Sequence, residues 1–154
     1  MKYFTIVVTL SVIVATALTI NVPANAQATN VSGLWSGTTL VTPCAFALSG
    51  RCNAQNKITL NLTQQSNRIT GSYTCAQGTM VCRNGGADNT GTVAWGRISG
   101  NLMRLNLTIP ADASNCYYNG MLVSATAMHG TYMCYNGGAL VEEGTWSVKR
   151  ASGK

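Results

Sequence analysis

Residues 57–75 read Lys-Ile-Thr-Leu-Asn-Leu-Thr-Gln-Gln-Ser-Asn-Arg-Ile-Thr-Gly-Ser-Tyr-Thr-Cys, and this stretch decides the fold. Apolar residues at 58, 60 and 62 alternate with polar ones, and a second alternation starts at Ile69. A period of two is the pattern of a half-buried strand, because successive side chains point to opposite faces. Ser66 and Asn67 form a short polar turn between the two runs. The stretch therefore predicts a β-hairpin.

Both halves of this hairpin recur later in the chain. The Leu-Asn-Leu-Thr of 60–63 returns at 105–108, and the segment 69–75 returns at 128–134 as Met-His-Gly-Thr-Tyr-Met-Cys. Eight strands are expected in total, two of them within 57–75 and the others at 31–42, 90–98, 102–109, 116–123, 127–135 and 144–150.

These strands are separated by turns rich in Gly, Asn and Ser, which indicates an all-β protein. Eight strands in succession favour a single antiparallel up-and-down β-barrel, because closure removes the exposed sheet edges. A two-sheet β-sandwich is the alternative.

The first 26 residues have the pattern of a cleaved secretory signal peptide. Lys2 precedes an uncharged apolar run over 4–20, and Ala24-Asn25-Ala26 is a small-x-small cleavage pattern, with a second register ending at Ala28. An uncleaved membrane anchor is the alternative, since the run is close to spanning length. We expect residues 27–154 to form the barrel domain, with short flexible ends, in a secreted or periplasmic protein.

Six cysteines lie beyond the predicted signal, and an even number in an exported chain argues for three disulfides. Fifteen pairings of six cysteines exist, so the connectivity is open. Local pairing is geometrically attractive, with the last pair facing each other across a hairpin that turns near Ala125. The candidate pairs are Cys44 with Cys52, Cys75 with Cys82, and Cys116 with Cys134. No histidine stands at zinc-ligand spacing, so no metal site is expected.

The sequence offers little for catalysis. His129 is the only histidine, and on a strand it shares a face with Thr131, so we expect it to point to solvent. Glu142 and Glu143 are adjacent, so in a strand their side chains diverge and cannot act as a pair. We expect no enzyme activity and no cofactor.

The charge pattern also limits the partners. Ten Lys and Arg against four Asp and Glu give a formal charge of +6, but no run of like charge appears. The simplest interpretation is a solvated, modestly basic surface, with no nucleic-acid partner and no membrane contact after signal removal. The oligomeric state is open.

Two short motifs resemble the calycin superfamily, which includes lipocalins and avidins. Gly33-Leu34-Trp35 resembles the Gly-x-Trp that lipocalins place on their first strand, and Lys149 or Arg150 matches the basic residue that lies over that Trp. Thr70-Gly71-Ser72-Tyr73 and Thr92-Val93-Ala94-Trp95 are similar to avidin strands. The resemblance implies a small barrel that holds a small molecule, although the residues with which avidins grip biotin have no counterparts here.

Alternation places one set of large side chains inside the predicted barrel. An eight-stranded barrel is just wide enough to be filled by side chains or to hold one small ligand. Gly71 and Gly130 would point inward and leave room beside Tyr73 and Tyr132, although an ordinary filled core is the alternative. The predicted ligand-binding residues are Trp35, Tyr73, Trp95, Met103, Tyr132 and Trp146.

The sequence therefore favours an exported, lipocalin-like binding protein that holds a small apolar or aromatic ligand in the barrel. The alternative is a secreted interaction module, such as a protease inhibitor, that contacts a protein partner through the loops 44–52 and 75–82. Rigid loops of this kind lower the entropic cost of binding.

Overall fold

A computed structural model describes residues 30–42, 53, 55–76, 89–109 and 114–151. The predicted signal peptide, the loop 44–52 and most of the loop 75–82 lie outside the described residues. Cys44, Cys52 and Cys82 lie outside them as well.

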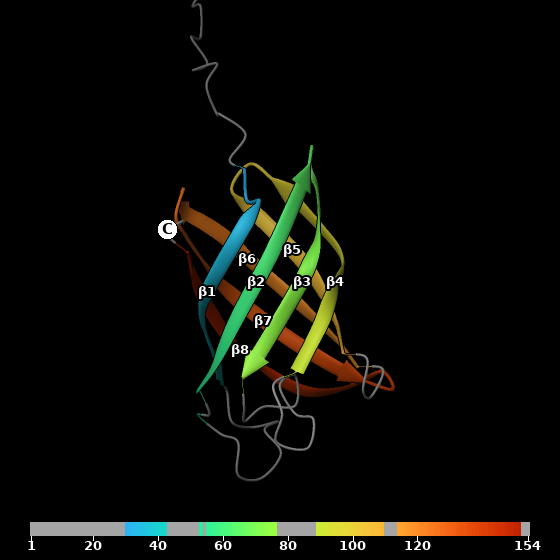
Figure 1. Cartoon of the computed structure of the whole chain (residues 1–154). Coiled ribbons are helices and arrows are strands. Elements are labelled where there is room, and N and C mark those ends of the chain that lie inside the picture. The colour runs from blue at the N-terminus through green and yellow to red at the C-terminus, as the bar shows by residue number, and fades with distance from the viewer. Residues whose placement is uncertain (1–29, 43–52, 54, 77–88, 110–113, 152–154) are drawn as a thin grey trace, which may run out of the picture.

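Eight antiparallel strands form one closed barrel, as Figure 1 shows. Each strand pairs with the next in sequence, and β8 pairs with β1. The up-and-down barrel is therefore confirmed over the β-sandwich, and no helix occurs in the part of the chain that the structure describes. The strands are β1 (Gly33–Val41), β2 (Gln55–Gln65), β3 (Arg68–Ala76), β4 (Asn89–Ser99), β5 (Leu102–Ile109), β6 (Ser114–Ser124), β7 (Ala127–Asn136) and β8 (Ala139–Arg150).

The two ends of the barrel differ. At one end, called the turn end here, short connections join β2 to β3, β4 to β5 and β6 to β7. At the other, the loop end, β1, β3, β5 and β7 finish at the bottom of Figure 1, and only two residues, Gly137 and Gly138, join β7 to β8 there. Within the described residues, no helix is long and apolar enough to cross a membrane.

Pairing of β1 with β8 closes the barrel, with Trp35 opposite Arg150 at one limit and Val41 opposite Gly144 at the other. The Arg150 guanidinium lies 4.4 Å from the centre of the Trp35 ring, as the resemblance to lipocalins implied. The same guanidinium donates hydrogen bonds to the carbonyl oxygens of Asn30, Ser32 and Ala125. The indole nitrogen of Trp35 donates to the Val31 carbonyl at 2.8 Å. This cluster fixes the start of β1 at the turn end.

Alternation predicts the interior well. Of the predicted ligand-binding residues, all except Trp95 are buried in the core. Trp95 is 43% exposed, because the pairing of β4 with β5 shifts between Val93 and Trp95. This bulge adds one residue to β4, so that Val93 and Gly96 point inward while Trp95 points outward. The prediction of an inward Trp95 is wrong for this reason.

The glycines do not open a space in the way expected. A Cβ on Gly71 would collide with the backbone of Asn61, and one on Gly130 with the backbones of Asn119 and Gly120. These two glycines therefore permit close approach of neighbouring strands. Other glycines make room for the interior rings. The ring of Tyr73 lies against Gly91, that of Trp146 against Gly120 and that of Tyr132 against Gly144.

Cys116 and Cys134 are bonded across the β6–β7 hairpin, which confirms that predicted disulfide. Cys75 is also disulfide-bonded, and its predicted partner Cys82 lies outside the described residues. All three described sulfurs are buried. Such bonds are consistent with an oxidising compartment.

Candidate functional site

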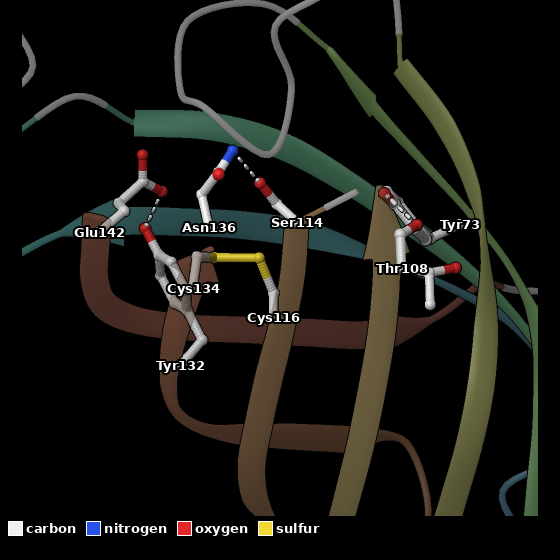
Figure 2. The surroundings of a disulfide bond; sticks show 8 residues. All are labelled: Tyr73, Thr108, Ser114, Cys116, Tyr132, Cys134, Asn136 and Glu142. Atoms are coloured by element: carbon white, nitrogen blue, oxygen red, sulfur yellow. Dashed lines mark hydrogen bonds between the residues drawn. A yellow bond between two sulfur atoms is a disulfide. The ribbon is translucent and has the colours of Figure 1, made fainter. Parts of the chain in front are cut away.

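A buried carboxylate and a tyrosine form the centre of a polar cluster at the loop end. The Tyr132 hydroxyl donates a hydrogen bond of 2.8 Å to Glu142 Oε1 (Figure 2). Tyr132 lies two residues before Cys134, which pairs directly with Glu142 on β8, so the two side chains are diagonal neighbours on the inner face. Glu142 is only 2% exposed. A charge buried to this degree is costly unless it is hydrogen-bonded, which makes this contact a structural requirement.

Tyr118 extends the cluster from β6. Its ring stacks on that of Tyr132, with centroids 5.1 Å apart and planes 15° apart. It also contacts the ring of Trp146 at a centroid distance of 5.7 Å. The Tyr118 hydroxyl is buried and has no hydrogen-bond partner in the described part of the barrel. An unpaired buried hydroxyl costs about 1–3 kcal/mol of stability, so this atom is a candidate to form a hydrogen bond with a ligand.

Asn56 and Thr39 extend the cluster onto β2 and β1. They are directly paired on β2 and β1, and Asn56 Nδ2 donates to Thr39 Oγ1 at 3.4 Å. Both residues are buried, and Thr39 also hydrogen-bonds Tyr132. Asn56 Oδ1 has no partner among the residues that the structure describes. The cluster therefore offers a second unpaired polar atom, in this case an acceptor.

The two central tyrosines resist ionisation. Burial raises the pKa of Tyr118 well above its usual value, and the charge of Glu142 and the nearby Tyr73 raise it further. The pKa of Tyr132 is raised first by burial and then by the charge and hydrogen bond of Glu142. Both phenols are consequently neutral hydrogen-bond donors at ordinary pH.

The structure places the predicted ligand-binding residues in three regions. Tyr132 and Trp146 belong to the cluster, and Tyr73 lies beside it, where its hydroxyl donates to the Thr108 carbonyl at 3.0 Å (Figure 2). Trp35 and Met103 are buried near the turn end, since Trp35 faces Arg150 and Met103 stands one residue beyond the start of β5. Trp95 lies on the outer surface.

Sequence reasoning missed four members of the cluster, which are Thr39, Asn56, Tyr118 and Glu142. Alternation alone was a sufficient signal for Tyr118, because it shares parity with the buried Cys116 and Leu122. Glu142 shares parity with the buried Trp146 and Val148, so alternation places it inside as well, although its charge argues against burial. The partner that makes its burial tolerable, Tyr132, becomes apparent only from the strand register.

His129, Glu142 and Glu143 are the described titratable side chains that the sequence analysis weighed for catalysis. His129 is exposed on the outer face, as predicted. Glu142 is buried and Glu143 is partly exposed, so the two carboxylates diverge. In the described strands, no three residues of the types His, Cys, Asp and Glu come close enough to hold a metal ion.

Comparisons with known proteins define the class of fold. No protein-family model matches the chain, and no curated protein matches it. A redesigned β-barrel superposes with a TM-score of 0.56 at 11% sequence identity, over 79% of this chain and 91% of that one. An S-type phycobiliprotein lyase from Guillardia theta gives a TM-score of 0.44 at 10% identity, over 80% of this chain and 90% of the lyase. The similarity to the redesigned barrel supports the fold alone.

Proposed function

We propose that this protein is an exported, calycin-like binding protein that holds a small aromatic ligand at the loop end of its barrel. The observation that carries the proposal is the pair of buried, unpaired polar atoms, the Tyr118 hydroxyl and Asn56 Oδ1. Buried polar atoms in folded proteins nearly always have a hydrogen-bond partner. A ligand that supplies this partner would remove the free-energy cost of leaving the atom unpaired.

The chemistry of the cluster suggests which ligand fits. Stacked rings of Tyr118 and Tyr132, with Trp146 beside them, form an aromatic wall. Aromatic rings favour offset or edge-on contact with another ring. A ligand hydroxyl can accept from the neutral Tyr118 phenol or donate to Asn56 Oδ1, whereas a purely apolar ligand would leave both atoms unpaired. A small phenol is therefore the best match.

Binding is proposed rather than catalysis. The Glu142 carboxylate accepts from Tyr132, and the single histidine of the chain stands outside the barrel. The proposal of export rests on the signal-like segment 1–26 and agrees with the buried Cys116–Cys134 disulfide.

Titration with small phenols, followed by Trp fluorescence, tests this proposal. Trp95→Phe provides the background, so that the signal comes from the two buried tryptophans. We expect Tyr118→Phe to weaken phenol binding about tenfold, since one hydrogen bond in a buried site is lost. Tyr117→Phe is the matched control, because the neighbouring side chain is exposed on the outer face and should leave binding unchanged.

Equal affinity in the Tyr118→Phe and Tyr117→Phe variants would contradict the proposed site. A fluorescence spectrum that no member of the phenol panel changes, together with native mass spectrometry showing the bare mass of protein from its own source, would contradict ligand binding in the barrel altogether.

A further inference from the structure

Three arginines form a row across the outer face of the barrel. Arg68 on β3 lies opposite Arg97 on β4, which in turn lies opposite Arg104 on β5. All three side chains are exposed. Neighbouring strands lie about 4.8 Å apart, and like charges directly opposite each other destabilise a sheet. Replacing one of these arginines by a neutral residue would therefore stabilise the sheet, which suggests that the row has a function.

The described carboxylates do not neutralise the row. Glu142 is buried inside the barrel, and Glu143 is on β8, where it faces Met133 of β7. Asp88 and Asp112 lie outside the described residues. Within the described strands, the positive charge is therefore available to an external anion.

Two grooves meet at this row and make a continuous track. The first has a volume of about 590 Å³ and is lined by Arg68, Arg97 and neighbouring residues. The second, of about 680 Å³, runs over β6 and β7 past Asn115, Tyr117 and Asn119. Trp95 and Arg104 line both grooves. We call the combined surface the arginine track.

Trp95 is outside because of the β4 bulge, and a buried polar atom lies next to it. Asn106 pairs with Trp95 on one side and with Tyr117 on the other. It alternates in phase with the exposed Arg104, yet it is only 6% exposed, and its Oδ1 has no partner among the described residues. Asn106 lines neither groove, so the track itself combines cations and an exposed indole.

We propose that the arginine track binds an acidic polysaccharide. Guanidinium groups form paired hydrogen bonds with sulfate-like and carboxylate oxygens. The electron-rich face of an indole attracts the weakly positive C–H groups of a sugar ring. Sugar hydroxyls can exchange hydrogen bonds with Asn115 and Asn119, which line the second groove.

A single-stranded nucleic acid fits the track less well. Its binding sites use successive aromatic rings on which bases stack. Here the Tyr117 ring packs edge-on against Tyr135, with centroids 5.9 Å apart, so these two rings contact each other. The lining of amides and hydroxyls matches sugars better than bases. This inference concerns the outside of the barrel wall and does not depend on the phenol site within it.

Isothermal titration calorimetry with short dextran sulfate chains tests the proposal, with neutral dextran and oligothymidylate as comparison ligands. The protein is produced with residues 1–26 intact, so that it is exported and its disulfides form. We expect dextran sulfate to bind, and Arg97→Ala with Arg104→Ala to reduce its affinity about tenfold or more. Trp95→Ala should reduce affinity several-fold while leaving the salt dependence unchanged, since it removes no charge.

Lys57→Ala with Lys149→Ala is the matched control. It removes the same charge from exposed positions on β2 and β8, away from the track. An affinity loss equal to that of the double arginine variant would mean that dextran sulfate responds to net charge alone, which would overturn the site. No binding of dextran sulfate would overturn it as well. Tighter binding of oligothymidylate, with the same dependence on Trp95, would replace the polysaccharide by a nucleic acid.

Discussion

At the scale of single residues, Tyr118 and Tyr132 are titratable groups whose ionisation the fold opposes. Below a pH of about 10, tyrosine is protonated in both the folded and the unfolded chain, so stability does not change through these groups. Above that pH the unfolded chain releases protons that the folded chain retains, because the folded pKa values are raised. Stability must therefore fall as pH rises towards the folded pKa values.

This predicts a decline of the unfolding free energy above a pH of about 10, with a limiting slope of about 2.7 kcal/mol per pH unit for two tyrosines. Urea unfolding at a series of alkaline pH values measures it. The Tyr118→Phe and Tyr132→Phe double variant should show a shallower decline, and Tyr117→Phe should behave as the unaltered protein does. The same slope in all three proteins would show that other groups cause the decline.

Gly130 is a second residue with a measurable role, because a Cβ there would enter the backbone of Asn119 and Gly120. We predict that Gly130→Ala lowers the unfolding free energy by about 1–3 kcal/mol, since neighbouring strands must move apart. Thr131→Ala alters the next, exposed residue and should cost about 1 kcal/mol or less. Denaturant unfolding compares the two, and equal stabilities would contradict the close approach at Gly130.

At the scale of strands, the bulge in β4 separates two tryptophans that the sequence makes look alike. Trp146 is 2% exposed and packs on Tyr118, whereas Trp95 is 43% exposed. Trp146→Ala should therefore cost about 3–5 kcal/mol of stability. Trp95→Ala should cost about 0.5 kcal/mol or less, as surface changes usually do. Thermal or urea unfolding distinguishes them, and a large loss in Trp95→Ala would mean that its side chain is buried.

The same comparison shows what alternation can and cannot predict. Ile58, Leu60 and Leu62 are inside as predicted, because a period of two maps directly onto the two faces of a regular strand. A bulge shifts that period by one residue, and nothing in Val93-Ala94-Trp95 marks where the shift falls. The contact of Tyr132 with Glu142 could not be predicted for another reason, since it depends on the register between β7 and β8.

At the scale of the whole molecule, closure depends on the seam between β1 and β8. Arg150 covers Trp35 and donates to the carbonyls of Asn30 and Ser32. Removing it loses a cation–π contact of about 0.5–2 kcal/mol together with hydrogen bonds to a charged group. We predict that Arg150→Ala lowers the unfolding free energy by about 2–4 kcal/mol.

Hydrogen exchange of the backbone amides locates that loss of stability. In Arg150→Ala we expect the exchange rate to increase most in the amides of β1. Lys149→Ala is the control, because its side chain is exposed, and its loss should change stability by about 0.5 kcal/mol or less. Equal exchange rates of the β1 amides in Arg150→Ala and Lys149→Ala would show that Arg150 does not stabilise the pairing of β1 with β8.

The seam has a consequence for the order of the chain itself. The amide of Ala151 donates to the Leu34 carbonyl at 2.8 Å, so the start of the first strand and the end of the last are neighbours. A short linker from 151 to 30, with new termini opened between Ser66 and Asn67, would preserve every strand ladder. Such a circular permutant should reach the same barrel, because the ring of neighbouring strands is unchanged by where the polypeptide is cut.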